Sequence, residues 1–374
     1  MKFISLKENL KQGLNIVSHL SSKNISLPIL NNILIKAKKE GLELMATNLE
    51  ISVNHFLRGK VEQEGEIIID SKLINEYINL LPEDKVEAQL KDGELNITCK
   101  NYKTKIKTQV SNDFPILPSI DNNNFYELNF DDFKNSLSEV FFAVSFNESR
   151  PELSGILFSF QENELILVGT DSYRLSEKKI KLKNKKSLGK KDLIIPLKTA
   201  QELFRILSNF KNEDQINDSD VVKINFSDNH IFFSFGTTNI SSKLVLGKYP
   251  DYQQIIPKTE KYQIEIEKTT LIRAVKSAGI FSKTGINDIS ISVNNGKVVV
   301  SSSSSQTGEN NIYLDANIKG DGDEILFNYK YLLDGLNNIK SDQIIIKMID
   351  NNNPIIIKSK EFDDFLYIMM PIRQ

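Results

Sequence analysis

The chain has 374 residues, 47 Lys and Arg against 49 Asp and Glu, and 40% hydrophobic residues. This length predicts two or three domains with buried cores, and the composition excludes a disordered protein. The single cysteine excludes an intramolecular disulfide, and no apolar run is long enough to span a membrane. The charged start lacks the pattern of a signal peptide, so we expect a cytoplasmic protein. A net charge of −2 gives no sign of a nucleic-acid partner.

A repeat of about one third of the chain organises the sequence. Apolar residues at helical spacing predict an amphipathic helix at the start of each third, over residues 6–20, 130–144 and 267–281. Alternating strands follow each helix. A short apolar strand, a polar turn, a lysine and a second helix then recur over 67–81, 193–207 and 325–339, with the lysines 126 and 132 residues apart.

The repeat predicts the order strand, helix, hairpin, strand, helix, hairpin in each third. This order is typical of an α+β fold with mainly antiparallel sheet. Proline-containing connectors at 111–124 and 247–259 mark the ends of the first two units. We therefore predict domains at 1–120, 121–255 and 256–374. Three unrelated α+β domains with accidental similarity are the alternative.

Motifs of common catalytic sites are absent from the sequence. It contains no phosphate-binding loop, no dinucleotide fingerprint, no zinc-protease motif and no paired cysteines. His19, His55 and His230 lie far apart in the chain, so no metal site and no cofactor are expected. Ser172 lacks the flanking glycines of a nucleophile elbow. The motifs favour a non-enzymatic protein, with a hydrolase that uses Ser172 and a β-rich protein-binding scaffold without DNA binding as alternatives. The lysine-rich stretch 176–192 is either a solvated hairpin or a contact surface.

Several segments, in order, resemble the bacterial DNA polymerase III beta subunit, the DNA sliding clamp. They are ATNLEI (46–51), GTDSYRL (169–175), SKLVLGKYPDYQQIIP (242–257) and MMPIR (369–373), supported by LPIL (27–30) and FNYKYLLDGL (327–336). The resemblance covers the whole chain. It implies the DNA clamp fold: two subunits of three similar domains, joined head to tail in a ring with sheets outside and helices lining the pore. Such a clamp is a processivity factor for DNA-directed DNA polymerase: it encircles double-stranded DNA and tethers replication and repair proteins.

The resemblance also implies a pocket between the second and third domains. In the family, this pocket takes a short peptide of the DNA polymerase III alpha subunit, the clamp loader and other partners. The chain departs from many relatives at Ser172, Tyr173 and Gln254. Carried over by position, the pocket comprises Leu153, Thr170, Ser172, Tyr173, Arg174, Leu175, Pro250, Gln254, Ile255, Asn328, Tyr331, Ile368, Met370, Pro371 and Arg373.

A clamp that slides must hold DNA by diffuse attraction to phosphate, so its basic residues must gather on the helices that line the pore. Helix candidates are Lys7, Lys11, Lys72, Lys134, Lys198, Arg205, Lys268, Arg273, Lys276 and Lys330, and loop candidates are Lys23 and Arg150. The residues that we expect to face DNA are Lys23, Lys72, Arg150, Lys198, Arg205, Arg273 and Lys276. At the subunit joint of the homodimer, Ile106, Ile280 and Phe281 resemble the apolar contacts of the family.

Overall fold

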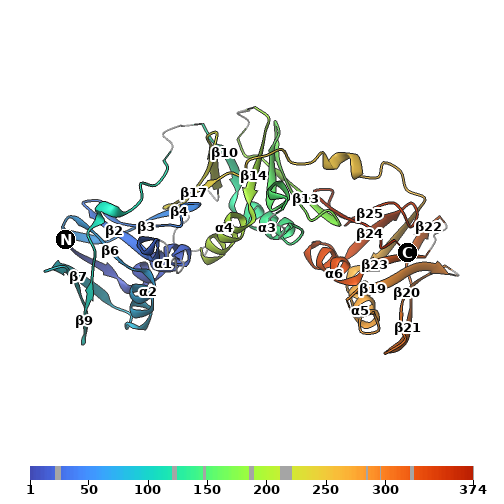
Figure 1. The fold of residues 1–374 in the computed structure, drawn as a ribbon, viewed down its shortest axis with the longest axis horizontal. Coiled ribbons are helices and arrows are strands. Elements are labelled where there is room, and N and C mark those ends of the chain that lie inside the picture. The colour runs from blue at the N-terminus through green and yellow to red at the C-terminus, as the bar shows by residue number, and fades with distance from the viewer. Residues whose placement is uncertain are drawn as a thin grey trace. The chain divides into compact units, whose positions relative to one another are not determined.

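The computed structural model describes residues 1–21, 27–119, 124–145, 149–184, 189–210, 221–283, 285–294, 296–320 and 324–373. Within them one order of elements occurs three times (Figure 1). The first third contains β1 (Lys2–Leu6), α1 (Lys7–Val17), β2 (Asn32–Lys38), β3 (Gly41–Thr47), β4 (Ile51–Leu57), β5 (Lys60–Gln63), β6 (Gly65–Asp70), α2 (Ser71–Leu80), β7 (Lys85–Lys91), β8 (Glu94–Cys99) and β9 (Tyr102–Lys107).

The other two thirds follow this order, except that the described part of the middle third has no strand at the position of β5. The middle third contains β10 (Tyr126–Asn129), α3 (Phe130–Phe141), β11 (Gly155–Phe160), β12 (Glu164–Thr170), β13 (Arg174–Lys181), β14 (Lys191–Pro196), α4 (Leu197–Asn209), β15 (Val221–Phe226), β16 (His230–Phe235) and β17 (Thr238–Lys243). The last third contains β18 (Tyr262–Glu267), α5 (Lys268–Gly279), β19 (Asp288–Asn294), β20 (Lys297–Ser304), β21 (Gly308–Leu314), β22 (Asn317–Lys319), β23 (Ile325–Asn328), α6 (Tyr329–Asn338), β24 (Gln343–Met348), β25 (Ile355–Ser359) and β26 (Phe365–Met369). The predicted α+β class is confirmed, but each predicted hairpin gains a third strand.

One compact unit comprises Met1–Phe130 and Arg205–Leu244. It contains a five-stranded sheet in the order β5-β1-β7-β8-β9 and an eight-stranded sheet in the order β10-β15-β16-β17-β4-β3-β2-β6. The larger sheet joins the first and the middle third of the chain, because β17 pairs antiparallel with β4. We call this pairing the first junction. Strand β9 lies at the edge of the smaller sheet.

The other compact unit comprises Asp131–Phe204 and Val245–Gln374. It contains a nine-stranded sheet in the order β14-β11-β12-β13-β26-β25-β24-β18-β22 and a four-stranded sheet in the order β21-β20-β19-β23. Here β13 of the middle third pairs antiparallel with β26 of the last, and we call this pairing the second junction. Strand β21 lies at the edge of the four-stranded sheet.

Side-chain caps explain the polar turn before the second helix of the repeat. The Asp70 carboxylate accepts a hydrogen bond from the amide of Leu73 (2.7 Å), and the Asn328 side chain accepts one from the amide of Lys330 (3.0 Å). Both caps satisfy amides in the first helical turn, which have no carbonyl partner within the helix. The polar residues of the repeat thus fix the starts of α2 and α6.

Apolar faces of the helices form the core beneath the sheets. Helix α1 packs beside α2, and α5 packs beside α6 (Figure 1). The close approach of α6 to its sheet needs a glycine, because a Cβ at Gly335 would lie 2.3 Å from the Tyr367 ring. The predicted helical spacing is confirmed by the burial of Leu10, Leu14, Val17, Leu271, Val275 and Ala278.

Candidate functional site

The turn between β12 and β13 adjoins the second junction. The Thr170 hydroxyl donates a hydrogen bond to the carbonyl oxygen of Arg174 (2.6 Å), and the Asp171 carboxylate accepts hydrogen bonds from the amides of Tyr173 and Arg174 (3.0 Å each). These bonds hold Ser172 in the left-handed region, at a φ of 76°. The turn is therefore well defined, and Ser172 and Tyr173 are exposed at its tip.

The turn between β3 and β4 has the same geometry at the first junction. The Thr47 hydroxyl donates to the carbonyl oxygen of Ile51 (3.0 Å), and Asn48 accepts from the amides of Glu50 and Ile51 (3.0 and 2.8 Å). Leu49 has a φ of 70°, close to that of Ser172. The two turns are copies of one structure, so their residues can be compared position by position, Ser52 with Leu175.

Arg174 connects the second turn to the helices. Its Nε donates to the Asp171 carboxylate (3.0 Å), and its terminal nitrogens donate to Asp334 on α6 and to the Phe142 carbonyl oxygen (2.9 Å). The guanidinium also lies 4.3 Å from the centre of the Tyr331 ring. Burial opposes the positive charge, but the hydrogen bond to Asp334 and the charge of Asp171 raise the pKa of Arg174 above its usual value. Arg174 thus connects the turn to α6 and to Phe142, and it is also a predicted pocket residue.

Leu175 belongs to an apolar cluster at the second junction. It pairs across the junction with Ile368, and both are buried together with Tyr249 and Tyr252 of the connector. The Tyr252 hydroxyl donates to the buried Glu177 carboxylate (2.6 Å). Burial and this hydrogen bond raise the pKa of Tyr252 above its usual value. The connector is therefore fastened to the sheet by two tyrosines.

The predicted pocket residues near this cluster have different environments. The turn Thr170–Leu175 and the end of β26 meet where the amide of Met370 donates to the Tyr173 carbonyl oxygen (2.8 Å). Leu153 is buried next to β11, in a 3-10 turn (Pro151–Leu153). Pro371 is buried, whereas Arg373 is exposed.

The remaining predicted pocket residues lie on the connector and at the start of α6. Pro250, Gln254 and Ile255 are exposed, and Pro250 lines a cavity of about 760 Å³ together with Tyr249 and Tyr252. Asn328 caps α6, and Tyr331 stacks on Arg174. The structure thus groups the predicted residues around the second junction, with some of them in structural roles.

Sequence reasoning missed the residues that hold this region together. Tyr249, Tyr252, Glu177, Asp334 and Phe142 anchor the connector and Arg174. The two tyrosines flank Pro250 in the segment KYPDYQ, and aromatic residues on both sides of a proline could have indicated an anchored connector. Asp334 gave no such signal, because its partner lies 160 residues away.

Basic residues of the first unit gather at one cavity. Lys72, Arg205 and His19 line a space of about 490 Å³ beside α1, α2 and α4. Arg205 donates to the carbonyl oxygens of Asn15 and Ile16 at the end of α1 (3.0 and 2.8 Å). Lys72 is exposed, with Glu76 at 3.7 Å. Two of the predicted DNA-facing residues therefore share one surface.

Other basic candidates differ in exposure. Lys7, one of the helix candidates, is only 4% exposed and bonds to Glu83, so its side chain is not available to DNA. The cause is burial of the first residue of α1 against the sheet. Lys23 lies outside the described residues. Arg150, Lys198, Arg273 and Lys276 are exposed.

The predicted joint residues lie on β9 and directly after α5. Ile106 on β9 is buried within its own sheet, at 5% exposure. Ile280, directly after α5, is 71% exposed, and Phe281 is half-buried. No helix among the described residues is long and apolar enough to cross a membrane.

Comparison with known proteins gives matches along the whole chain. Models of the DNA polymerase III beta subunit match as N-terminal domain (1–118), central domain (127–251) and C-terminal domain (253–373). The beta sliding clamp of Staphylococcus aureus is 29% identical over 384 residues, covering 100% of this chain and 99% of the relative.

Solved structures agree with the sequence matches. The sliding clamp of Bacillus subtilis is 25% identical with a TM-score of 0.93, covering 100% of this chain and 99% of that chain. A putative beta subunit from Eubacterium rectale is 28% identical with a TM-score of 0.91, covering 100% of both chains. The fold also matches a Pseudomonas aeruginosa clamp bound to griselimycin, at 24% identity, a TM-score of 0.93 and 100% coverage of both chains. The chain therefore belongs to the DNA polymerase III beta subunit family of non-catalytic sliding clamps, the processivity factors of DNA replication.

Proposed function

We propose that two copies of this chain close head to tail into a ring around duplex DNA and tether a replicative polymerase and other clamp-binding proteins to it. The domains of the ring are 1–120, 121–255 and 256–374, and its place of action is the cytoplasm. A ring that encloses DNA gains processivity from topology, so weak, sequence-independent contacts with phosphate suffice. The exposed Lys72, Lys198, Arg273 and Lys276 on the helices suit such contacts.

One observation about the strands carries the proposal. At both junctions the last strand of one third pairs with the strand that ends the first hairpin of the preceding third: β17 with β4, and β26 with β13. The equivalents that remain are β9 and β21, and both lie at sheet edges. Strand edges with unpaired amides and carbonyls pair readily with another chain. A third junction of the same kind then forms between β21 of one copy and β9 of the next.

The repeat also predicts the register of this joint. Counted back from the second helix, Glu309 on β21 has the position of Ser52 on β4 and Leu175 on β13. Counted from the preceding turn, Lys105 on β9 has the position of Ser241 on β17. Because Ser52 pairs with Ser241, the same register places Glu309 opposite Lys105 of the partner subunit. Both side chains are exposed in the single chain.

Charge exchange at this pair tests the ring. We expect Lys105→Glu and Glu309→Lys each to weaken dimerisation at least tenfold, since each puts like charges opposite one another at both joints. The double variant restores the pair and should restore the dimer. Lys91→Glu is the matched control on β7, away from the edge, and should leave the sedimentation mass unchanged. A monomeric wild type, or a double variant no more dimeric than either single one, would contradict the proposed joint.

Tethering needs a separate test. Polymerase extension on a primed circular template should become processive when the protein and a clamp loader are added, and unchanged processivity would contradict the clamp function. For the pocket, Tyr173→Ala should weaken binding of a polymerase C-terminal peptide, because Tyr173 is 63% exposed at the tip of the turn. Phe362→Ala, which truncates another exposed aromatic ring, is the control. Equal binding by all three proteins would remove Tyr173 from the pocket.

A further inference from the structure

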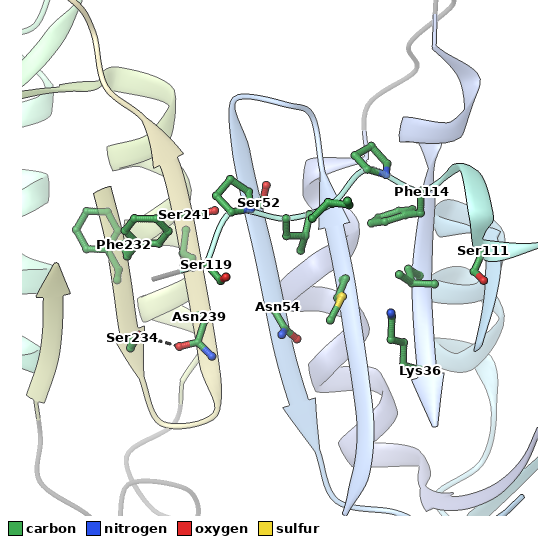
Figure 2. A pocket seen from close by; sticks show the side chains of 18 of the residues that line it. Lys36, Ser52, Asn54, Ser111, Phe114, Ser119, Phe232, Ser234, Asn239 and Ser241 are labelled. Carbon is green, nitrogen blue, oxygen red and sulfur yellow. Dashed lines mark hydrogen bonds between the residues drawn. The ribbon is translucent and has the colours of Figure 1, made fainter. Parts of the chain in front are cut away.

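A cavity of about 520 Å³ lies at the first junction, under the connector that leads out of the first third. We call it the junction cavity. Figure 2 shows its floor on β4, β16 and β17 and on the neighbouring strands of the first third, with the connector from Phe114 to Ser119 running across them. Its volume is within the range of about 300–1,000 Å³ typical of ligand sites. All of its lining residues belong to one compact unit.

One half of the junction cavity is apolar. Leu34 and Phe114 belong to a buried cluster on this face of the sheet, and Met45 and Leu117 pack against it. Ile116 on the connector also lines the cavity, although its side chain is 98% exposed. When a ligand covers an exposed apolar side chain that lines a cavity, apolar surface is removed from water and the free energy of the system falls. This half therefore suits an apolar side chain.

The other half is polar but uncharged. Its lining is formed by Ser52 and Asn54 from β4, Asn239 and Ser241 from β17, and Ser234 from β16 (Figure 2). Hydroxyl and amide groups both donate and accept hydrogen bonds, and they match the amides of a peptide. The charged pair at the edge of the cavity is already satisfied: Lys36 lies 2.9 Å from Glu66, which also accepts from Ser111. A charged ligand would find no counter-charge on this floor.

Asn54 supplies a separate sign of a missing partner. Its side-chain oxygen is shielded from solvent and accepts no hydrogen bond from the described residues. Its neighbour across the junction, Asn239, is engaged, because its side-chain oxygen accepts from the Ser234 hydroxyl (2.7 Å). A shielded acceptor without a donor costs about 1–3 kcal/mol. Because Asn54 lines the junction cavity, an amide donor bound there would supply the partner that this oxygen lacks.

We propose that the junction cavity is a second peptide-binding site, which takes a short, uncharged, extended segment of a partner protein in which an apolar side chain lies next to an amide side chain. The repeat supports this assignment. The connector proline Pro115 follows Phe114 as Pro250 follows Tyr249, and Ser52 and Ser241 take the positions of Leu175 and Ile368. This last step rests on the proposed peptide pocket at the second junction, whereas the cavity, its lining and Asn54 do not.

Methionine signals can test the two sites separately. The chain has five methionines, of which Met45 lines the junction cavity and Met370 lies at the second junction. The full-length protein, labelled with ¹³C at its methionine methyl groups, is titrated with N-acetyl-leucyl-asparaginyl-leucine methylamide. We expect a saturable shift of the Met45 signal. A polymerase C-terminal peptide should shift Met370 instead, so either site can fail without the other.

Two variants and two controls complete the test. Asn54→Leu should weaken binding of the tripeptide about five- to tenfold, because the acceptor is lost. Ile116→Ala, which truncates an exposed side chain and leaves folding intact, should weaken it several-fold. Asn96→Leu, on β8 of the other sheet, should bind like the wild type. Replacing the central asparaginyl group of the probe by aspartyl should abolish binding. The proposal is overturned if Met45 does not shift saturably, if both variants bind as tightly as the wild type, or if the aspartyl probe binds equally well.

Discussion

The two junctions have the same backbone and opposite chemistry. Both begin with a turn in which a threonine and an Asp or Asn hold a left-handed residue, and both continue into an antiparallel pair of strands. At matching positions the first junction pairs Ser52 with Ser241, whereas the second pairs Leu175 with Ile368. Main-chain hydrogen bonds therefore join the thirds at both junctions, and the side chains can differ without loss of this pairing.

The difference extends to the connectors. At the second junction two tyrosines of the connector pack with the apolar pair and bond to the sheet, whereas Ile116 of the first connector stays in water. The proposed peptide pocket at the second junction would need a few exposed apolar anchors on such a fixed frame. A repeated junction can thus be specialised by its outward-facing residues without loss of the strand pairing itself.

Among the variants that test the difference between the junctions, replacement of Arg174 should lower the free energy of unfolding most. Ile51 takes the same position in the first turn, so Arg174→Ile converts one turn toward the other. The variant leaves Asp171, which is largely buried, and the more exposed Asp334 without their partner, and breaking a buried pair such as Arg174–Asp171 costs about 3 kcal/mol. Chemical denaturation should show this loss in the free energy of unfolding, with exposed Arg150→Ile as control. A loss no greater than in the control would show that Arg174 does not hold the second junction.

Truncation of the cross-junction pair comes next. Ile368→Ala should destabilise the protein by about 3 kcal/mol, since it opens a space in a buried cluster. Ser241→Ala, at the matching position, should cost less than about 1 kcal/mol. The free energies of unfolding of both variants measure how much each junction depends on its side chains. Equal losses would mean that the apolar pair is no more important than the serine pair.

A pH titration distinguishes the junctions by a smaller effect. His55 at the first junction is buried, and burial lowers its pKa from 6.5 to about 4. Between these values the unfolded chain binds the proton and the folded chain does not, so stability falls as the pH falls from about 6.5 to about 4. The loss is on the order of 2 kcal/mol at pH 4.5.

The matching position at the second junction holds Lys178, which is paired with Glu139 and Asp364. Comparison of the free energy of unfolding at pH 7 and 4.5 in wild type and His55→Gln should show a larger loss in the wild type. His230→Gln, on the neighbouring strand β16, should keep the wild-type dependence. An unchanged pH dependence in His55→Gln would assign the acid sensitivity elsewhere.

Local features of the fold could be predicted from the sequence. The spacing of Leu10, Leu14 and Val17 predicts the buried face of α1, and the polar turn before the second helix predicts its start. The pairing of Arg174 with Asp171 also follows from their closeness in the chain. Such interactions depend on residues a few positions apart, and periodicity records them directly.

Interactions between distant segments could not be predicted in the same way. At the two junctions the third strands pair across thirds of the chain, and nothing within β17 or β26 indicates the partner. In the sequence Lys7 and Lys72 cannot be told apart, because both lie in the first turn of a helix. Burial against the sheet and the bond to Glu83 separate them, and both depend on tertiary packing.

The two free edges have a consequence for solubility and assembly control. Because β9 and β21 differ in sequence, a contact between them is heterologous, and such a contact either closes after a fixed number of copies or continues as an open filament. Only the closed form leaves neither strand with unpaired main-chain groups. In the proposed ring, closure therefore prevents open-ended growth of a filament, and opening of one joint exposes the edges of both β9 and β21.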